Sequence, residues 1–583
     1  MSTLTWVLVG VAIYWAALLS LRNRGLLPSY IGTQGPIITL HTKRGRVLLD
    51  RLSRPRRFWR AFSNVGVGIA LVVMALSFAF VLFAAVSALY TPERTAVTEP
   101  RNVVVIPGVN DFLPLSVAPE IVFGLLVALV VHEGAHGLLC RVEGIDIESM
   151  GVALLAIVPI GAFVEPDHES QQRADRGGRT RMFAAGVTAN FVVTVLAFGL
   201  LFGPVAGSIA VAPGAPVGGA FPGSPAAGAG IEAGDRITAV DGQSVADAGE
   251  LDEALSGADG EVVLTVDGER EVTVEREVSV AETVDGGPSG LEAGDTVASV
   301  NGQSVTTEAE FREAVGADPT ATVRTAAGAE HTFAAGALST VAEDGPASAA
   351  GMPAGERVVI TAVDGERTVD SGELTSVLRT TEPGQTVEIE AVVDGQVETY
   401  TVELGEHPGG YGQVGINVQP GVSGVVVDDL GIQPYPASTF LGLLGGDGDA
   451  GANTLVGAIL VALTLPIFSI VDPSVPFNFA GFTGFVTEFY VVEGALAPLG
   501  GGVFVLANLL FWTGWINLNL GFFNCIPAFP LDGGHILRTS TEAIVSRLPI
   551  SGSYELTKTV TISVGVTMLV GLLVMIFGQG LLV

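Results

Sequence analysis

Long apolar runs alternate with polar stretches along this chain of 583 residues. A helix needs about 20 apolar residues to cross a bilayer, and several of these runs approach or exceed that length. No small-residue cleavage site follows the first run, which predicts an anchor and not a removable signal peptide. We expect about six membrane spans, at residues 4–21, 63–90, 119–140, 182–210, 502–523 and 559–582.

The region between the fourth and fifth runs has a different pattern, and this pattern repeats. Three segments share a Gly-Asp or Gly-Glu step, at Gly234, Gly294 and Gly355, as in "GIEAGDRITAVDGQSV" and "GLEAGDTVASVNGQSV". In each segment alternating apolar residues predict a strand, and an Asp-Gly or Asn-Gly pair predicts a tight turn. A short helix and a charged pair of strands follow, so each segment predicts a small α/β unit.

These segments resemble PDZ domains, including the core pattern xGLxxGDxIxxVNGxxV. We assign PDZ-like repeats to residues 212–278, 279–338 and 339–420, of which the second is short. The resemblance implies a groove between a strand edge and the helix, which captures an extended peptide or a chain end by strand addition. The alternative is a spacer of small β-rich domains without a ligand.

Charge is concentrated in this repeated region. The formal net charge of the chain is −32, and residues 211–420 contain 37 Asp and Glu against 8 Arg, which leaves about −3 for the rest. Only Lys43 and Lys558 are lysines. Dense carboxylates keep a surface hydrated, so the composition suggests a salt-adapted prokaryote. Acidity this strong argues against nucleic acid as a partner.

Basic residues predict how the chain is oriented in the cell membrane. Ten Lys and Arg lie in residues 22–60, and four Arg lie in the loop 167–181. The positive-inside rule places both segments in the cytoplasm. The PDZ-like repeats are then extracytoplasmic, and the run 119–140 has its C-terminal end near the cytoplasmic face.

The stretch "LVVHEGAHGLL" places His132, Glu133 and His136 inside an apolar run. Residues four apart share a helix face, so the two imidazoles can bind one metal ion while Glu133 takes a proton from its water. A lone H-E-x-x-H is often accidental on a soluble helix. Ionisable groups inside a membrane span are costly and usually functional, which favours the metal site here.

Zinc requires a third protein ligand and an open position. The candidate is Asp532 in "FFNCIPAFPLDGGHILR", where two prolines and a Gly-Gly pair end an apolar span. Irregular backbone at membrane depth persists only where it is buried or lines a cavity. We therefore expect Asp532 to face the bundle interior and to complete a His-His-Asp site.

The pairing of H-E-x-x-H with N-x-x-P-x-x-P-L-D-G-G, and PDZ-like segments between them, resembles the site-2 protease family of intramembrane zinc metalloproteases. The resemblance implies one Zn²⁺ per chain, held by His132, His136 and Asp532. It further implies Glu133 as general base and Asn524 as a polar group that stabilises the oxyanion. Substrates would be membrane proteins with a transmembrane helix.

Two further stretches match this family. "GAFVEPD" lies within an expected membrane-embedded hairpin at 150–166, and "AAGVTANF" contains Gly186 and Asn190, which we interpret as packing residues. His535 is given no ligand role. The expected fold is a multi-pass α-helical membrane protein with this hairpin and an inserted array of PDZ-like α/β domains. Its membrane parts are a two-span anchor at 1–92, a catalytic core at 119–211 and 453–540, and a C-terminal span at 541–583.

Three alternatives stay open from the sequence. Residues 453–498 are interpreted as a re-entrant or surface-lying segment, with a true pair of spans as the alternative. A membrane scaffold with a degenerate metal site could bind peptides through the PDZ-like repeats. A soluble zinc peptidase would need H-E-x-x-H on an amphipathic helix, whereas residues 121–131 are apolar on every side.

Overall fold

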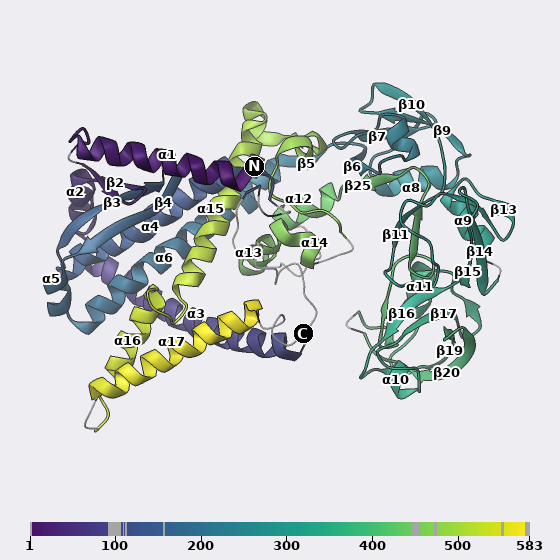
Figure 1. Ribbon diagram of the computed structural model, residues 1–583. Helices are drawn as coiled ribbons and strands as arrows, with labels where there is room; N and C mark the ends of the chain where they lie inside the picture. Colours follow the sequence, from purple (N-terminus) through teal and green to yellow (C-terminus); the bar gives the residue numbers. More distant parts are fainter. Residues whose placement is uncertain are drawn as a thin grey trace. The chain divides into compact units, whose positions relative to one another are not determined.

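The chain folds into two compact units in the computed structural model (Figure 1). Unit 1 comprises Met1–Ala210 and Ser438–Val583, and unit 2 comprises Val211–Ala437. Unit 2 is therefore inserted into unit 1. The structure describes residues 3–28, 30–90, 107–108, 110, 113–155, 158–316, 318–407, 409–445, 454–471, 475–549 and 553–577.

Unit 1 is built on long apolar helices, as expected of a membrane protein. In the part of the chain that the structure describes, five helices are long and apolar enough to span a membrane. The first predicted span is α1 (Thr3–Asn23), of which Val9–Asn23 counts as a shorter apolar helix, and the last extends past the described residues. The number of spans thus stays a prediction. The five are α3 (Arg56–Tyr90), α4 (Ala118–Glu143), α6 (Arg176–Leu200), α15 (Gly502–Asn524) and α17 (Ser553–Phe577).

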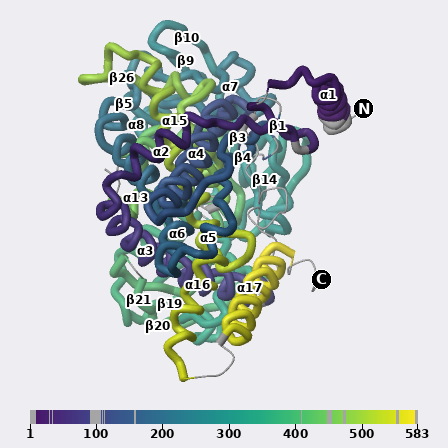
Figure 2. The backbone as a smooth tube through the Cα atoms, turned by 90° about the vertical axis from the view of Figure 1, so that its left-hand side faces the viewer, coloured from purple at the N-terminus to yellow at the C-terminus, as the bar shows by residue number. Residues whose placement is uncertain are grey.

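Helices α4, α6 and α15 pack against one another and form the centre of unit 1. Glycines let them approach closely: a Cβ on Gly124 of α4 would lie 2.9 Å from the Trp512 carbonyl, and one on Gly514 of α15 would lie 2.9 Å from the Phe198 ring. Small residues are the usual means of close helix packing in membranes. In Figure 2, α4 and α6 lie at the centre of the view, with β3 and β4 beside α4.

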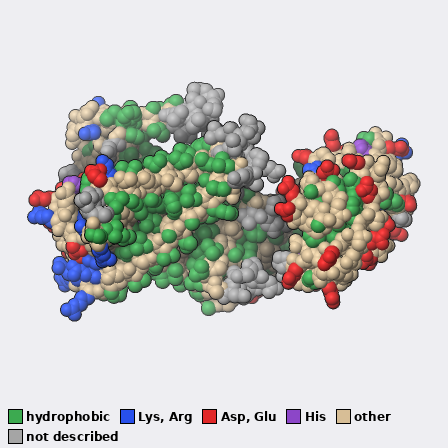
Figure 3. Space-filling model, turned by 90° about the horizontal axis from the view of Figure 1, so that it is seen from below, with side chains coloured by type: hydrophobic (Ala, Val, Ile, Leu, Met, Phe, Trp, Pro, Cys, Tyr) green, Lys and Arg blue, Asp and Glu red, His purple; other side chains and the backbone are tan. Residues whose placement is uncertain are grey.

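One end of this bundle is held by a buried carboxylate. Glu143, at the end of α4, accepts bonds from Arg60 of α3 at 2.9 and 3.1 Å and from Arg181 of α6 at 2.8 Å. Its side chain is 2% exposed. Three helices therefore meet at a charge that is fully compensated, as a buried carboxylate must be. Figure 3 shows the Lys and Arg side chains gathered at one end of unit 1, with apolar side chains over its middle.

The hairpin predicted at 150–166 is present as β3 (Ile147–Leu155) and β4 (Val158–Pro166). The sequence did not predict that β1 (Ile31–Gln34) and β2 (Ile37–His41) extend it into a four-stranded sheet of order β1-β2-β3-β4. Residues Ile37 to His41 pair with Leu155 to Gly151. Because β4 is the last strand, its outer edge pairs with no other strand in the part of the chain that the structure describes.

The segment 453–500 contains only short elements among its described residues, the longest apolar stretch being Leu455–Ile470. It is fastened to α15 by side chains. Asn508 bonds the backbone amide and carbonyl of Phe482 at 2.8 and 3.0 Å, and the Trp512 indole donates to the Ala480 carbonyl at 3.0 Å. Whether this segment lies at the surface, re-enters or forms a pair of spans stays a prediction, and residues 453 and 472–474 lie outside the described chain.

Among its described residues, unit 2 contains three larger antiparallel sheets, each with its own apolar core and a short helix, and two further two-stranded sheets. The first has the order β10 (Arg270–Glu275), β9 (Glu261–Val266), β7 (Arg236–Val240), β6 and β25, with α8 (Ala248–Ser256). The second has the order β13 (Gln303–Ser304), β12 (Val297–Val300), β14 (Thr320–Thr325) and β15 (Glu330–Ala334), with α9 (Glu308–Gly316), beside a pair β11-β24. The third has the order β20, β19, β17 (Arg357–Val363), β16 and β23, with α11 (Ser371–Arg379). Strands used below are β6 (Ala215–Ala220), β11 (Ser279–Thr283), β16 (Ala337–Val341), β19 (Thr386–Val393), β20 (Gln396–Glu403), β23 (Ile416–Val418), β24 (Val425–Asp428) and β25 (Ile432–Pro434).

The tight turns predicted in the repeated pattern are present in all three sheets. Asp241, Asn301 and Asp364 have φ of 49°, 50° and 49°, and each is followed by a glycine of positive φ. Such pairs form the type I′ turn of a hairpin. In each turn the side-chain oxygen accepts the amide of a strand residue, at 2.8, 2.8 and 2.7 Å. The three segments thus share one local structure.

The chain returns through the three sheets in reverse order. Strand β23 pairs with β16 of the third sheet, β24 then pairs with β11, and β25 pairs with β6 of the first. Two of these strands lie beyond residue 420, where the predicted repeats end. Each of the first two α/β segments is therefore completed by a strand that follows the third, and the segments are nested rather than consecutive.

Candidate metal centre

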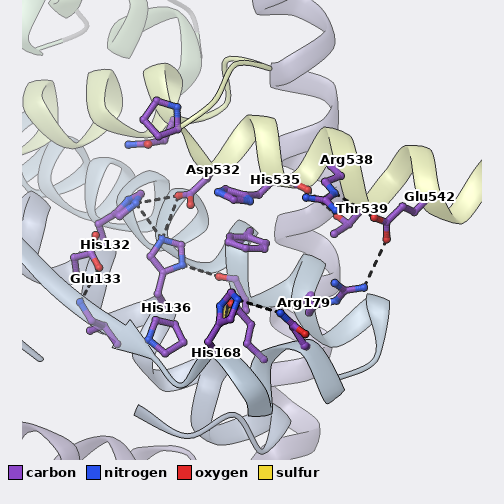
Figure 4. Close-up of a pocket in the computed structure, with 18 residues that line it drawn as sticks. His132, Glu133, His136, His168, Arg179, Asp532, His535, Arg538, Thr539 and Glu542 are labelled. Atoms are coloured by element: carbon purple, nitrogen blue, oxygen red, sulfur yellow. Dashed lines mark hydrogen bonds and ion pairs between the residues drawn. The ribbon is translucent and has the colours of Figure 1, made fainter. Parts of the chain in front are cut away.

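His132 and His136 project from one face of α4, as their spacing requires. Their Nε2 atoms are 3.1 Å apart. Asp532 begins α16 (Asp532–Val545), and its Oδ2 lies 3.0 Å from His132 Nε2 and 3.1 Å from His136 Nε2 (Figure 4). Among the described residues, this is the one group of three His, Cys, Asp or Glu whose ligand atoms converge within 4.8 Å. The fold joins residues 396 positions apart.

The turn between α15 and α16 explains how Asp532 reaches the imidazoles. Helix α15 ends at Asn524, and the chain folds back on itself before α16 begins. A Cβ on Gly533 would lie 2.3 Å from the Ile526 carbonyl, and one on Gly534 would lie 2.9 Å from Ala528. The glycines after Asp532 are therefore required for the start of α16 to pack against the turn.

Helix α6 orients both imidazoles. The Nδ1 of His136 lies 2.7 Å from the Met182 carbonyl, which can only accept, so this nitrogen carries the hydrogen. The lone pair of His136 Nε2 then points towards Asp532 and His132. Asn190, fully buried, places its side-chain amide 3.3 Å from His132 Nδ1. These are the outer partners that metal-binding histidines generally have.

The three ligand atoms fit a zinc ion. Zinc binds imidazole nitrogen and carboxylate oxygen at about 2.0–2.2 Å, and a tetrahedral arrangement places such ligands about 3.3 Å apart. The observed separations of 3.0–3.1 Å lie close to this value. Two neutral imidazoles and one carboxylate form a typical catalytic zinc set, which leaves a fourth position for water or substrate.

Glu133 lies in the cavity that contains these ligands. Its Oε2 accepts the backbone amide of Val164 in β4 at 3.1 Å. The cavity has a volume of about 770 Å³, and Asn524 also lines it. The Asn524 amide donates to the Leu520 carbonyl at 3.0 Å, within its own helix, so one of its two hydrogens is engaged. All five predicted site residues therefore line one cavity, while their roles stay predictions.

His535 also lines the cavity but is not part of the ligand group. Its ring stacks on Phe183, with centroids 4.3 Å apart and an interplanar angle of 6°, and meets Phe529 edge-on. Burial lowers the pKa of His535, which favours the neutral ring. His535 thus packs between two aromatic rings at the wall of the cavity.

The sequence missed three contacts of this site: the Met182 carbonyl, the β4 amide at Val164, and the polar role of Asn190. The first two are backbone groups, which leave no mark in the residue types. Asn190 did leave a signal, because a polar residue inside an apolar span is costly unless it has a partner.

Comparison with known proteins agrees with this geometry. The profile of Peptidase family M50 matches residues 120–572, which include α4, α15 and α16. A protein of Neisseria meningitidis named "Putative zinc metalloprotease" is 24% identical over 456 residues, 73% of this chain and 90% of that protein. One of the same name from Vibrio cholerae is 24% identical over 502 residues, 75% and 92% of the two chains.

An uncharacterised protein of Methanocaldococcus jannaschii is 30% identical over 203 residues, which are 34% of this chain. The match spans about half of that relative, 52% of its length. The profile match covers more than three quarters of the present chain and includes both parts of the ligand group. The chain therefore belongs to Peptidase family M50, the site-2 protease family.

Proposed function

We propose that this protein is an intramembrane zinc endopeptidase that cleaves transmembrane segments of other membrane proteins. The observation that carries the proposal is the convergence of His132, His136 and Asp532 within 3.1 Å, on apolar helices and beside Glu133. A zinc ion held there would polarise a scissile carbonyl and acidify water. The PDZ-like segments would bind peptides or chain ends, and are proposed to be extracytoplasmic, with the metal centre near the cytoplasmic face.

Glu133 is suited to accept and return a proton. One carboxylate oxygen is fixed by the Val164 amide, which leaves the other free to take a proton from attacking water. The same group can then protonate the leaving amine, as a general acid–base catalyst does. The second amide hydrogen of Asn524 is available to the developing oxyanion.

Strand β4 supports an extended substrate. A helical peptide bond is protected by its own hydrogen bonds, so the substrate must unwind before cleavage. The Val164 amide points away from β3, since it donates to Glu133, and so marks the free edge of β4. A polypeptide added along this edge would run past Glu133.

The test uses purified protein in detergent and a tagged single-span polypeptide whose helix is weakened by central Asn and Gly. Glu133→Gln should leave zinc content unchanged and lower cleavage at least ~100-fold, because it removes the base. Asp532→Ala should lower zinc content itself. Glu169→Gln, at an exposed carboxylate paired with Arg173, is the matched control and should cleave normally. Cleavage by the Glu133→Gln protein at the normal rate would exclude the proposed mechanism.

A further inference from the structure

A second cavity of unit 1 lies between α16 and α17, apart from the ligand group of the metal centre. It has a volume of about 220 Å³. The two helices pack against each other, and Phe529, in the turn before α16, also lines the cavity. Helix α17 is one of the five that are long and apolar enough to span a membrane, and only 17% of its most apolar stretch is buried inside the structure. The cavity therefore lies beside a helix whose surface is mostly open to lipid.

Two basic side chains line this cavity, Arg538 of α16 and Lys558 of α17. Within the described chain no carboxylate pairs with Lys558, and Arg538, 51% exposed, pairs with Glu542 of its own helix at 3.3 Å. The other oxygen of Glu542 faces Arg179 of α6 at 3.6 Å (Figure 4). The charge of Glu542 is thus shared with a third cation, which leaves an excess of positive charge at the cavity.

Lys558 lies at the level expected of lipid headgroups. Helix α17 has 25 residues, more than the about 20 that the hydrocarbon core of a bilayer requires, so its first turns extend beyond the core. Lys558 is the sixth residue of the helix, and Tyr554, which also lines the cavity, is the second. Tyrosine is enriched where the core meets the headgroups, and lysine near a helix end extends its ammonium group to the same level. The cavity is therefore open to ligands that belong to the membrane surface.

An apolar stripe on α17 leads away from the cavity along the helix. It begins at Ile562, which lines the cavity and lies one helix turn after Lys558. Its members recur at helical spacings and so share one face with Lys558. Each is about half exposed: Ile562, Val566, Leu569, Val570 and Leu573. An acyl chain lying on this stripe would place its headgroup beside Arg538 and Lys558.

Charge and position together favour one class of ligand. Phosphate oxygens are strong acceptors for guanidinium and ammonium groups. Basic pockets between membrane helices, at the membrane surface, are typical places for anionic lipid headgroups. A soluble phosphate compound would leave the apolar stripe uncovered, whereas a phospholipid would contact both the cations and the stripe.

We infer that the cavity between α16 and α17 binds the phosphate of an anionic phospholipid through Arg538 and Lys558, with an acyl chain of that lipid on the stripe that begins at Ile562. Arg538 and Glu542 also line the cavity that contains the predicted zinc ligands. Helix α16, which the bound lipid contacts, begins with Asp532. The lipid therefore holds the helix that supplies one of those predicted ligands.

Amine labelling tests the inference, because Lys43 and Lys558 are the only lysines of the chain. The full-length protein is placed in nanodiscs of phosphatidylcholine alone, or with about 30% phosphatidylglycerol of the same acyl chains, the anionic lipid that serves as the probe. Brief treatment with an acetylating reagent is followed by mass spectrometry of both lysines. An anionic surface slows the labelling of any amine near it, so Lys43 records this general effect. The readout is the ratio of acetylation at Lys558 to that at Lys43.

Phosphatidylglycerol should lower this ratio at least ~5-fold, because a bound phosphate covers the Lys558 ammonium group. Inorganic phosphate, at about 10 mM with nanodiscs of phosphatidylcholine alone, should leave the ratio unchanged, because it has no acyl chain to bind the stripe.

Substitution of Arg538 tests the second cation. Arg538→Gln should restore the ratio towards its value in phosphatidylcholine, because one of the two groups that hold the phosphate is lost. Arg547→Gln is the matched control. It removes the same charge from an exposed arginine in the turn after α16, which does not line the cavity, and should keep the protection of Lys558.

An unchanged ratio with phosphatidylglycerol, or the same fall with inorganic phosphate, would overturn the inference. So would protection that persists in the Arg538→Gln protein or is equally lost in the Arg547→Gln protein. The first two outcomes need no substitution, so the inference stays testable if a variant does not fold. Labelling requires no cleavage, so failure of the proposed protease function would leave this result as it stands.

Discussion

At the scale of single residues, the contact between Asn190 and His132 decides which ring nitrogen of His132 carries the hydrogen and which is left to bind a metal ion. The amide nitrogen of Asn190 faces His132 Nδ1 at 3.3 Å, and the Asn190 oxygen is buried without a partner. The oxygen and nitrogen of an amide are assigned from their hydrogen bonds. With the two exchanged, the Asn190 oxygen accepts Nδ1–H, and His132 Nε2 is left as a free ligand. One exchange thus satisfies both groups.

With this assignment Asn190 would orient His132, one of the predicted zinc ligands. Asn190→Leu should weaken zinc binding about 10- to 100-fold, the usual effect of losing an outer partner of a ligand. Asn190→Asp keeps an acceptor at the same place and should retain zinc far better. Competition with a chelator of known affinity measures both. If Leu and Asp variants hold zinc equally, Asn190 is a packing residue only.

The convergence of the three predicted ligands was within reach of sequence reasoning, while their role as ligands stays a prediction. His132 and His136 share a helix turn, so their spacing alone places them together. Asp532 was found because a Pro- and Gly-rich turn with one carboxylate is unusual at the end of an apolar span. The acceptor role of Asn190 was not found, because it exists only once α6 has packed on α4.

At the scale of elements, the contact between α6 and α4 depends on Gly186. A Cβ at this position would lie 2.6 Å from His136 Nε2 and 2.8 Å from His132 Nε2. No Cβ can approach ring atoms so closely, and here those atoms are the predicted ligands. Helix α6 therefore leaves no room for a side chain where it faces the two imidazoles, so the packing role expected for Gly186 bears directly on the predicted ligands.

Gly186→Ala should displace α6 or the imidazoles and so lower zinc affinity. Overpacking of this kind typically costs about 1–3 kcal/mol. Gly199→Ala on the same helix is the matched control, because its Cβ would have no atom within 4 Å and alanine favours a helix by up to about 1 kcal/mol. Zinc affinity and thermal unfolding of both variants separate the two effects. Equal zinc affinity in the two would show that the ligands tolerate the shift.

The sheet beside the metal centre shows where prediction from elements ends. The hairpin β3-β4 is local in sequence and was expected, whereas β1 and β2 join it across more than 100 residues. Strands β1 and β2 lie in the basic segment 22–60, whose charge was used only to predict the orientation of the chain in the membrane. The returning strands β24 and β25 were missed for the same reason: pairing partners far apart in sequence leave no local pattern.

At the scale of the whole molecule, an acidic unit is inserted into an almost neutral one. Unit 2 adds Asp428 and Asp429 to the 37 acidic residues of 211–420, against 8 Arg. Figure 3 shows Asp and Glu side chains over the face of unit 2 that is in view. Such a charge density destabilises a compact fold through self-repulsion unless salt screens it. The habitat suggested by composition thus becomes a physical prediction.

Unit 2 should loosen as salt is withdrawn, while the helices of unit 1 change little. The Debye length falls from about 10 Å at 0.1 M salt to about 3 Å at 1 M, so neighbouring carboxylates repel strongly only in the dilute condition. Amide hydrogen exchange on the full chain in detergent, at 0.1 M and 3 M KCl, follows both units in one sample.

Replacing Glu388 and Glu390, two exposed residues of β19, by Gln should make the hydrogen exchange of β19 and β20 depend less on salt. Thr399→Ser on β20, opposite Glu390, changes no charge and should leave it as it was. An equal response of the two units, or one unaffected by removing these charges, would mean that the acidity of unit 2 does not govern its stability.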